Sequence, residues 1–184
     1  PATFHGWMRI LRVVEEGVLW LFQDNPWAVE NLKREAEKQG IAADRLVFAE
    51  QLPLSEHLAR HRHANLFLDT FPYNAHTTAS DALWTGLPVL TLMGQTFASR
   101  VAASLLNAIG LPELITNAQE EYEALAIELA LNPKKLADIK LKLANNRLTT
   151  PLFDSPLFTK NIESAYIKIY ERHLAGLPPE CIYV

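Results

Sequence analysis

Cysteine is almost absent from this chain of 184 residues, which contains only Cys181. A single cysteine can form no disulfide within the chain and no metal site built from cysteines alone. Such sparse use of cysteine is typical of proteins in a reducing compartment, and we expect a cytoplasmic location.

Long apolar runs, glycine-rich motifs and an excess of basic residues are also missing. No stretch resembles a signal peptide or a spanning helix, so we expect no membrane association. The seven glycines do not form the dinucleotide-binding or P-loop patterns. The formal net charge of -4 argues against broad nucleic-acid binding, although it allows a small anionic ligand that is held locally.

The remaining composition is that of a soluble globular domain, with 49% hydrophobic and 21% charged residues. The length allows one domain with a sizeable core. The chain begins at Pro1 inside a helical pattern and without a methionine, so we interpret it as a piece of a longer protein.

Helical and strand patterns alternate along the first half of the chain. This alternation predicts parallel strands with right-handed crossovers, which make a Rossmann-like doubly wound α/β sheet. Additional helices follow, including one capped by Thr96 and a long terminal helix over about 156–175. The predicted strands are 18–22, 46–48, 65–68 and 89–92. The predicted helices before and between them are 3–17, 26–40, a short helix that opens with Pro53 and Ser55 and runs through Arg60, and a helix capped by Thr77 or Thr78 that runs to Trp84.

The stretch LFLDTFPYNAHTTASDALWTGLP (66–88) has a strand that ends in a polar loop, followed by a short helix capped by Thr77 or Thr78. The first backbone N–H groups of such a helix have no intrahelical acceptor, and the helix dipole is positive there. This end therefore suits an anion such as phosphate. Asp81 can close a capping box with Thr78 or bind a sugar hydroxyl. The alternative is that both residues only cap the helix.

Three loops follow strand ends, at 50–57, 69–78 and 93–97. Ligands of doubly wound sheets bind beyond the carboxyl ends of the strands, so we expect these loops to face one crevice. Asp69 is interpreted as a hydrogen-bond acceptor that fixes its loop, not as a catalytic group. His76 either binds a ligand or bonds within its own loop.

Histidines at 57, 61 and 63 raise the question of a metal site. His57 and His61 would share a helix face, but no glutamate completes the metalloprotease pattern. We therefore expect no metal.

The strings LFLDTFPYNAHTTASDALWTGLPVLTL and TFASRVAASLLNAIGLPELI resemble the C-terminal catalytic half of the O-GlcNAc transferase and SPINDLY family. These are glycosyltransferases of the GT-B architecture. The resemblance extends without large gaps from residue 1 to about 176. It implies that residues 1–184 form the nucleotide-sugar-binding C-terminal lobe of a GT-B fold with extra C-terminal helices.

The resemblance also implies roles for individual residues. In the animal enzymes, the threonines that match Thr77 and Thr78 hold the UDP diphosphate, with the histidine that matches His76 beside it. The aspartate that matches Asp81 holds the ribose. The segment that matches 52–60 binds the base, which assigns this role to Leu52, His57 and Arg60.

The chain departs from the animal enzymes at two of these positions. Tyr73 replaces a small cysteine near the N-acetyl group of the donor, which could reshape the sugar pocket. Leu54 replaces a lysine that contacts the nucleotide. SPINDLY proteins, which use GDP-fucose, share the LDTFPY string but lack the HTTASD pattern. That pattern therefore favours UDP.

The resemblance implies a metal-independent donor-binding half of a protein O-glycosyltransferase, which transfers GlcNAc from UDP-GlcNAc to serine or threonine of an acceptor protein. Family members place a diphosphate-binding lysine and glutamine just before the segment that matches Pro1, and an N-terminal lobe contacts the acceptor. We therefore expect no catalytic residue within this chain and no activity of the chain alone. The expected partners are that lobe and tetratricopeptide repeats. The alternatives are a degenerate lobe that serves as an interaction module, and an O-fucosyltransferase.

Overall fold

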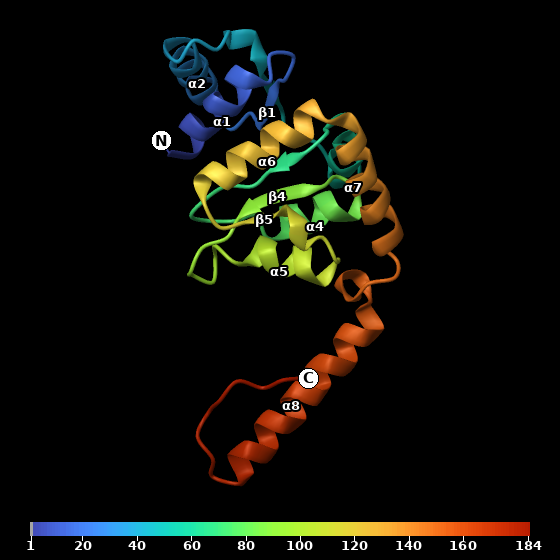
Figure 1. Ribbon diagram of the computed structural model, residues 1–184. Helices are drawn as coiled ribbons and strands as arrows, with labels where there is room; N and C mark the ends of the chain where they lie inside the picture. The colour runs from blue at the N-terminus through green and yellow to red at the C-terminus, as the bar shows by residue number, and fades with distance from the viewer. Residues whose placement is uncertain (1) are drawn as a thin grey trace.

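The computed structural model describes residues 2–184, and Pro1, where the family resemblance begins, lies outside the described residues. Helices and short parallel strands alternate along the first two thirds of the chain (Figure 1). The strands are β1 (Leu19–Phe22), β2 (Leu46–Ala49), β3 (Phe67–Leu68), β4 (Val89–Leu92) and β5 (Ile115–Thr116). The helices are α1 (Ala2–Val13), α2 (Pro26–Lys38), α3 (Leu54–Arg60), α4 (Thr77–Trp84), α5 (Val101–Ala108), α6 (Gln119–Leu131), α7 (Pro133–Asn146) and α8 (Ser155–Leu174).

All strand pairs are parallel, which confirms the α/β prediction. The hydrogen bonds divide the strands into two sheets, β1-β2 and β3-β4-β5, where the sequence predicted one. The sequence also gave no sign of β5, because a strand of two residues is too short to show a periodic pattern. Each short connection between neighbouring strands contains a helix, as parallel pairing requires.

The three-stranded sheet has helices on both faces, with α6 on one and α4 and α5 on the other (Figure 1). Alternate residues of β4 explain this arrangement, since successive side chains of a strand point to opposite faces. Val89 packs with α4 and α5, whereas the next residue, Leu90, packs with α1 and α6. A separate apolar cluster joins α1 and α2 to the β1-β2 sheet. Helix α1 therefore contacts both sheets.

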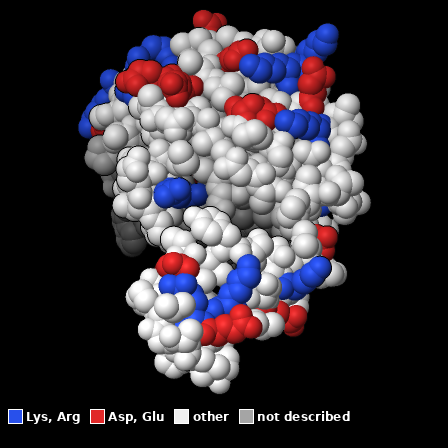
Figure 2. Space-filling view, turned by 60° about the horizontal axis from the view of Figure 1, so that its bottom comes forward, with Lys and Arg blue, Asp and Glu red and all other residues white. Residues whose placement is uncertain are grey.

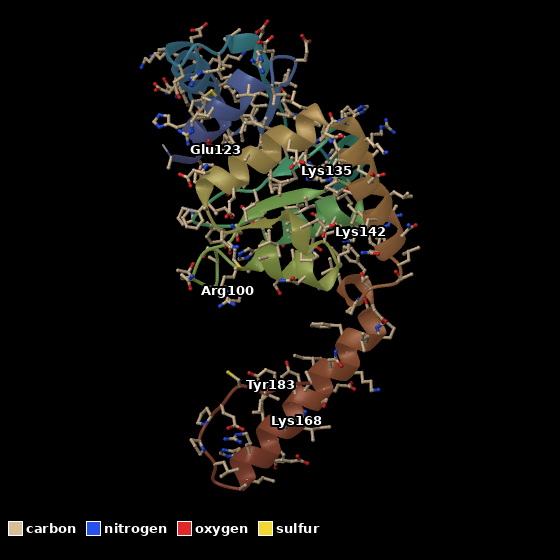
Figure 3. The ribbon with its side chains drawn as sticks, in the orientation of Figure 1. Arg100, Glu123, Lys135, Lys142, Lys168 and Tyr183 are labelled. Atoms are coloured by element: carbon tan, nitrogen blue, oxygen red, sulfur yellow. The ribbon has the colours of Figure 1, made fainter. Side chains whose placement is uncertain are left out.

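Helix α8 extends away from the remaining structure (Figure 1) and buries none of its residues, in agreement with the predicted range of about 156–175. It begins at Asp154, whose carboxylate accepts a hydrogen bond from the Leu157 amide at 2.9 Å. The C-terminal tail folds back along it, and the Lys168 ammonium donates to the Tyr183 carbonyl at 2.5 Å (Figure 3). No helix between residues 2 and 184 is both long and apolar enough to cross a bilayer.

The predicted helix after Thr96 starts later than expected, at Val101. Thr96 and Ser99 bond to each other instead of opening a helix: the Ser99 hydroxyl donates to the Thr96 carbonyl at 3.1 Å. Short hydroxyl side chains compete in this way with helical hydrogen bonds. As a result Phe97 lies outside that helix and is 82% exposed.

Positive and negative side chains are interleaved on the face that Figure 2 presents, without one dominant basic patch. The α7 lysines follow this pattern. Lys135 pairs with Glu128 and Lys142 pairs with Glu113, each at 2.7 Å (Figure 3). This part of α7 is a solvated face, as its charge pattern suggests.

Candidate functional site

The loop between β3 and α4, residues 69–76, is organised around the buried carboxylate of Asp69. One carboxylate oxygen accepts hydrogen bonds from the amides of Thr70 at 2.8 Å and Ala75 at 2.7 Å. The other accepts from the Thr91 hydroxyl on β4 at 2.6 Å. The side chain thus joins both ends of the loop to the sheet, and the interpretation of Asp69 as a loop-fixing acceptor is confirmed.

Burial raises the pKa of Asp69 above its ordinary value, while the hydrogen bonds from Thr91, Ala75 and Thr70 act in the opposite direction. The Tyr122 hydroxyl on α6 donates to the Asp69 carbonyl at 2.9 Å. Burial also raises the pKa of Tyr122, so its hydroxyl stays a donor at neutral pH. The sequence gave no sign of this bond, although a buried tyrosine hydroxyl usually has a partner.

The far side of the loop is fixed by Asn74 and by close packing at Gly94. The Asn74 amide side chain donates to the Thr70 carbonyl at 2.9 Å, and its backbone N–H donates to the Ala98 carbonyl at 3.0 Å. A Cβ at Gly94 would lie 2.8 Å from the Phe71 ring, so only glycine allows this approach of the two loops. The loops at 69–76 and 93–99 therefore lie against each other, as the crevice prediction requires.

The N-cap of helix α4 is His76, one residue before the first of the two predicted caps, and Thr77 and Thr78 lie in the first turn. No side chain caps this end. Both threonines are exposed, and within residues 2–184 neither hydroxyl has a hydrogen-bond partner. The capping box between Thr78 and Asp81 is not formed either. The helix therefore presents unpaired N–H groups and two free hydroxyls to solvent.

The His76 ring is held by aromatic neighbours. It stacks on the Tyr73 ring, with the centroids 4.9 Å apart, and meets the Phe97 ring edge-on at 6.1 Å. Its Nε2 atom is buried and has no partner among the described residues. The ring is thus fixed beside the open end of α4, with one polar atom available. The contact with Phe97 was not predicted, because the helix expected after Thr96 would include this residue.

The three residues expected at the base lie on or before α3. The Arg60 guanidinium donates to the Glu50 carbonyl at 2.8 Å and to His57 Nδ1 at 2.7 Å, and it lies over the Trp20 ring at 5.6 Å. An arginine can only donate, so neutral His57 carries its proton on Nε2. Leu52 is 39% exposed. The structure therefore brings His57 and Arg60 together and leaves the Nε2–H of His57 as a donor.

Helices α3 and α4 are joined at their C-terminal ends, by the residues that follow Arg60 and Trp84. His61 Nδ1 and the Thr85 hydroxyl are 3.0 Å apart. Burial, and secondarily the neighbouring His57, lower the pKa of His61, and the carboxylate of Asp81 partly opposes this. The first turns of both helices follow strand carboxyl ends, so they lie at the same edge of the molecule.

Within the described part of the chain, no three His, Cys, Asp or Glu side chains converge as metal ligands would.

The site residues thus form two groups. His76, Tyr73 and the two threonines gather at the start of α4, and His57 and Arg60 gather on α3. No direct contact joins the groups. A hollow of about 720 Å³ adjoins the first group, since Phe97 lines it together with Met93 and Arg100. Arg100 itself points outward at the surface (Figure 3).

Three comparisons with known proteins show what this chain is similar to. A sequence model described as Glycosyl transferase family 41 matches residues 1–162. A protein of Arabidopsis thaliana named probable UDP-N-acetylglucosamine–peptide N-acetylglucosaminyltransferase SEC is 39% identical over 98% of this chain. The Caenorhabditis elegans UDP-N-acetylglucosamine–peptide N-acetylglucosaminyltransferase is 33% identical over 97%. The chain spans 18% and 16% of the lengths of these two relatives.

A solved structure, a mutant of the O-GlcNAc transferase of Thermobaculum terrenum, has the same fold. It aligns with a TM-score of 0.88 at 33% identity, covering 92% of this chain and 33% of that one. The doubly wound arrangement and the family resemblance are thereby confirmed. From the alternation of its elements, its family match and its likeness to these proteins, we conclude that this chain belongs to glycosyl transferase family 41.

Proposed function

We propose that this chain is the donor-binding C-terminal lobe of a GT-B protein O-glycosyltransferase, which transfers GlcNAc from UDP-GlcNAc to serine or threonine. The observation that carries the proposal is the open start of α4, where Thr77 and Thr78 have exposed hydroxyls and no side chain caps the helix. The names of the Arabidopsis and nematode relatives support the donor and the peptide acceptor.

The chemistry of the first group suits a leaving diphosphate. Transfer of a sugar builds negative charge on the phosphate oxygens as the bond to the anomeric carbon breaks. Unpaired N–H groups, two hydroxyls and the positive end of the α4 dipole can stabilise that charge. The free Nε2 of His76 adds a further polar contact beside it. No metal ion is needed for this stabilisation, and metal-independent transfer is part of the proposal.

The nucleoside would bind between the two groups. His57 would present its Nε2–H to an acceptor on the base, and the exposed Leu52 would contact the base edge with the Arg60 segment. Asp81, one turn along α4, would accept hydrogen bonds from the ribose hydroxyls. Tyr73, whose ring stacks on His76, would border the sugar pocket. Orientation of the acceptor hydroxyl is left to another lobe of the complete protein, so the chain alone should not catalyse transfer.

Calorimetric titration with UDP tests the proposal. We expect a dissociation constant of about 1 mM or tighter. The double variant Thr77→Val/Thr78→Val should weaken binding at least about tenfold, because each lost charge-assisted bond costs roughly 1.5–3 kcal/mol. The control is Thr159→Val, which removes an exposed hydroxyl on α8 and should leave the affinity unchanged.

Two outcomes would contradict the proposal. Absence of UDP binding in both this chain and the complete protein would favour an interaction module. Tighter binding of GDP than of UDP in competition would instead favour a fucosyl donor. Peptide glycosylation by the complete protein, and none by this chain, would support the division between the lobes.

A further inference from the structure

A side-chain hydrogen bond joins the two helices that carry the candidate site. His61 is the C-cap of α3 and Thr85 is the C-cap of α4, and the His61 Nδ1 atom lies 3.0 Å from the Thr85 hydroxyl oxygen. Within residues 2–184 no other hydrogen bond runs between these two helices or their caps. The group on α3 and the group at the start of α4 are therefore linked indirectly, through this bond.

The Thr85 side of the bond is anchored in α4 itself. The Thr85 hydroxyl donates to the carbonyl of Asp81 at 3.0 Å and to that of Ala82 at 2.9 Å. Because its single proton is used within the helix, the Thr85 oxygen is left to accept from the Nδ1–H of His61. Ala82 and Leu83 are fully buried in the core, so this end of α4 has a fixed position.

The His61 side of the bond leads to the residues expected at the base. The His61 ring meets the His57 ring edge-on, with the centroids 4.8 Å apart and the planes at 72°. His57 accepts a hydrogen bond from the Arg60 guanidinium at 2.7 Å, and Arg60 donates to the Glu50 carbonyl at 2.8 Å. Glu50 directly follows β2. A continuous series of contacts thus extends from the C-cap of α4 to the carboxyl end of β2.

The candidate ribose ligand, Asp81, lies close to the same histidine. Burial, the largest effect, and the neighbouring His57 lower the pKa of His61, whereas the Asp81 carboxylate raises it. Asp81 is also one helical turn before Thr85 and accepts from its hydroxyl through the backbone carbonyl. His61 is therefore surrounded by residues that the proposed function assigns to the nucleoside, although it is not one of them.

We propose that His61 and Thr85 are positioning residues for the nucleotide, because their hydrogen bond sets the separation between the base-binding group on α3 and the phosphate-binding group on α4. The inference rests on the proposed function, since it needs one ligand that spans both groups. A ligand that binds two groups at once gains affinity only when their separation matches its own length. Binding side chains keep such a geometry when their own neighbours hold them in place.

Ligands should respond to loss of this bond according to the number of groups that they contact. UDP would contact His57 and Arg60 through its base, Asp81 through its ribose and the start of α4 through its diphosphate. Inorganic pyrophosphate would contact only the start of α4. Loss of the bond should therefore weaken the binding of UDP and leave that of pyrophosphate unchanged. A general distortion of α4 would weaken both.

Calorimetric titration with UDP and with pyrophosphate tests the inference, in this chain or in the complete protein if only that protein binds UDP. Thr85→Val removes the hydroxyl and keeps the shape of the side chain. We expect the variant to bind UDP about fivefold more weakly, which is the effect of one net hydrogen bond on an equilibrium constant. The dissociation constant of pyrophosphate should stay within about twofold of the native value, because a ligand of one group does not depend on the separation.

Two controls separate the bond from other effects of the substitution. Thr85→Ser keeps the hydroxyl and should bind UDP as the native protein does. His61→Leu removes the other partner of the bond. The double variant His61→Leu/Thr85→Val should bind UDP no more weakly than His61→Leu alone, because both changes break the same bond. Additive losses in the double variant would count against the inference.

The possible failures have different meanings. Native UDP affinity in Thr85→Val would overturn the positioning role and leave the proposed function intact. Equal weakening of UDP and pyrophosphate would also overturn it, because the bond would then only support the fold of α4. Absence of UDP binding by both the native chain and the complete protein would refute the proposed function and this inference together.

Discussion

Replacement of Asp69 by alanine tests whether one buried carboxylate organises the candidate site. The change removes all three hydrogen bonds that the side chain accepts, from the amides of Thr70 and Ala75 and from the hydroxyl of Thr91. It also leaves these donors in a place that water reaches poorly, because Asp69 is only 3% exposed. The loop 69–76 would then lose its attachment to β4.

The expected loss of stability follows from the number of bonds. At ~1 kcal/mol for each hydrogen bond, Asp69→Ala should lower the free energy of unfolding by about 3 kcal/mol. A domain of this size loses roughly 2–4 °C of melting temperature per kcal/mol, so the midpoint should fall by about 6–12 °C. Part of the gain from the bonds is offset in the native protein by the cost of burying the charge, which raises the Asp69 pKa.

Urea and thermal unfolding followed by circular dichroism give the measurement. Asp138→Ala is the control, since Asp138 lies exposed on α7 and its loss should change the free energy by less than about 0.5 kcal/mol. The reasoning is refuted if Asp69→Ala destabilises the chain no more than this control does.

The isosteric variant Asp69→Asn separates the charge from the shape. The folded pKa of Asp69 is raised, so the folded state holds its proton more tightly than the unfolded state, whose pKa is near the ordinary value of 3.8. This group therefore makes the free energy of unfolding fall as pH rises from 3.8 through the folded pKa. Urea unfolding at several pH values gives the free energy of unfolding of the native chain and of Asp69→Asn. The difference between these two free energies should fall as the pH rises over this range.

Two further substitutions test single contacts of the site. Tyr122→Phe removes the hydroxyl that donates to the Asp69 carbonyl at 2.9 Å. The free energy of unfolding, measured in urea, should fall by about 1–2 kcal/mol. A fall below about 0.3 kcal/mol would show that the bond contributes little. The folded pKa of His61 lies below 6.5, so the native chain loses free energy of unfolding as the pH falls from 6.5 toward that pKa. His61→Gln should therefore make the free energy of unfolding less dependent on pH just below pH 6.5. An unchanged pH profile in the variant would exclude His61 as its source.

The sequence by itself determined the features that depend on near neighbours along the chain. Helical spacing and the residues that begin and end helices predicted the order of helices and parallel strands and the long helix α8. The same local pattern located the anion-suited end of α4, with an error of one residue in its cap. These features follow from local backbone geometry, so a window of ten or twenty residues contains the information.

Tertiary structure alone decided which distant groups meet. Asp69 binds Thr91, 22 positions away, and receives the hydroxyl of Tyr122, 53 positions away. The placement of Phe97 over His76, and the division of the strands into two sheets around an apolar groove, likewise depend on packing between elements. No local pattern encodes these contacts, because each side chain satisfies its own propensity equally well with many partners and only the folded arrangement selects one.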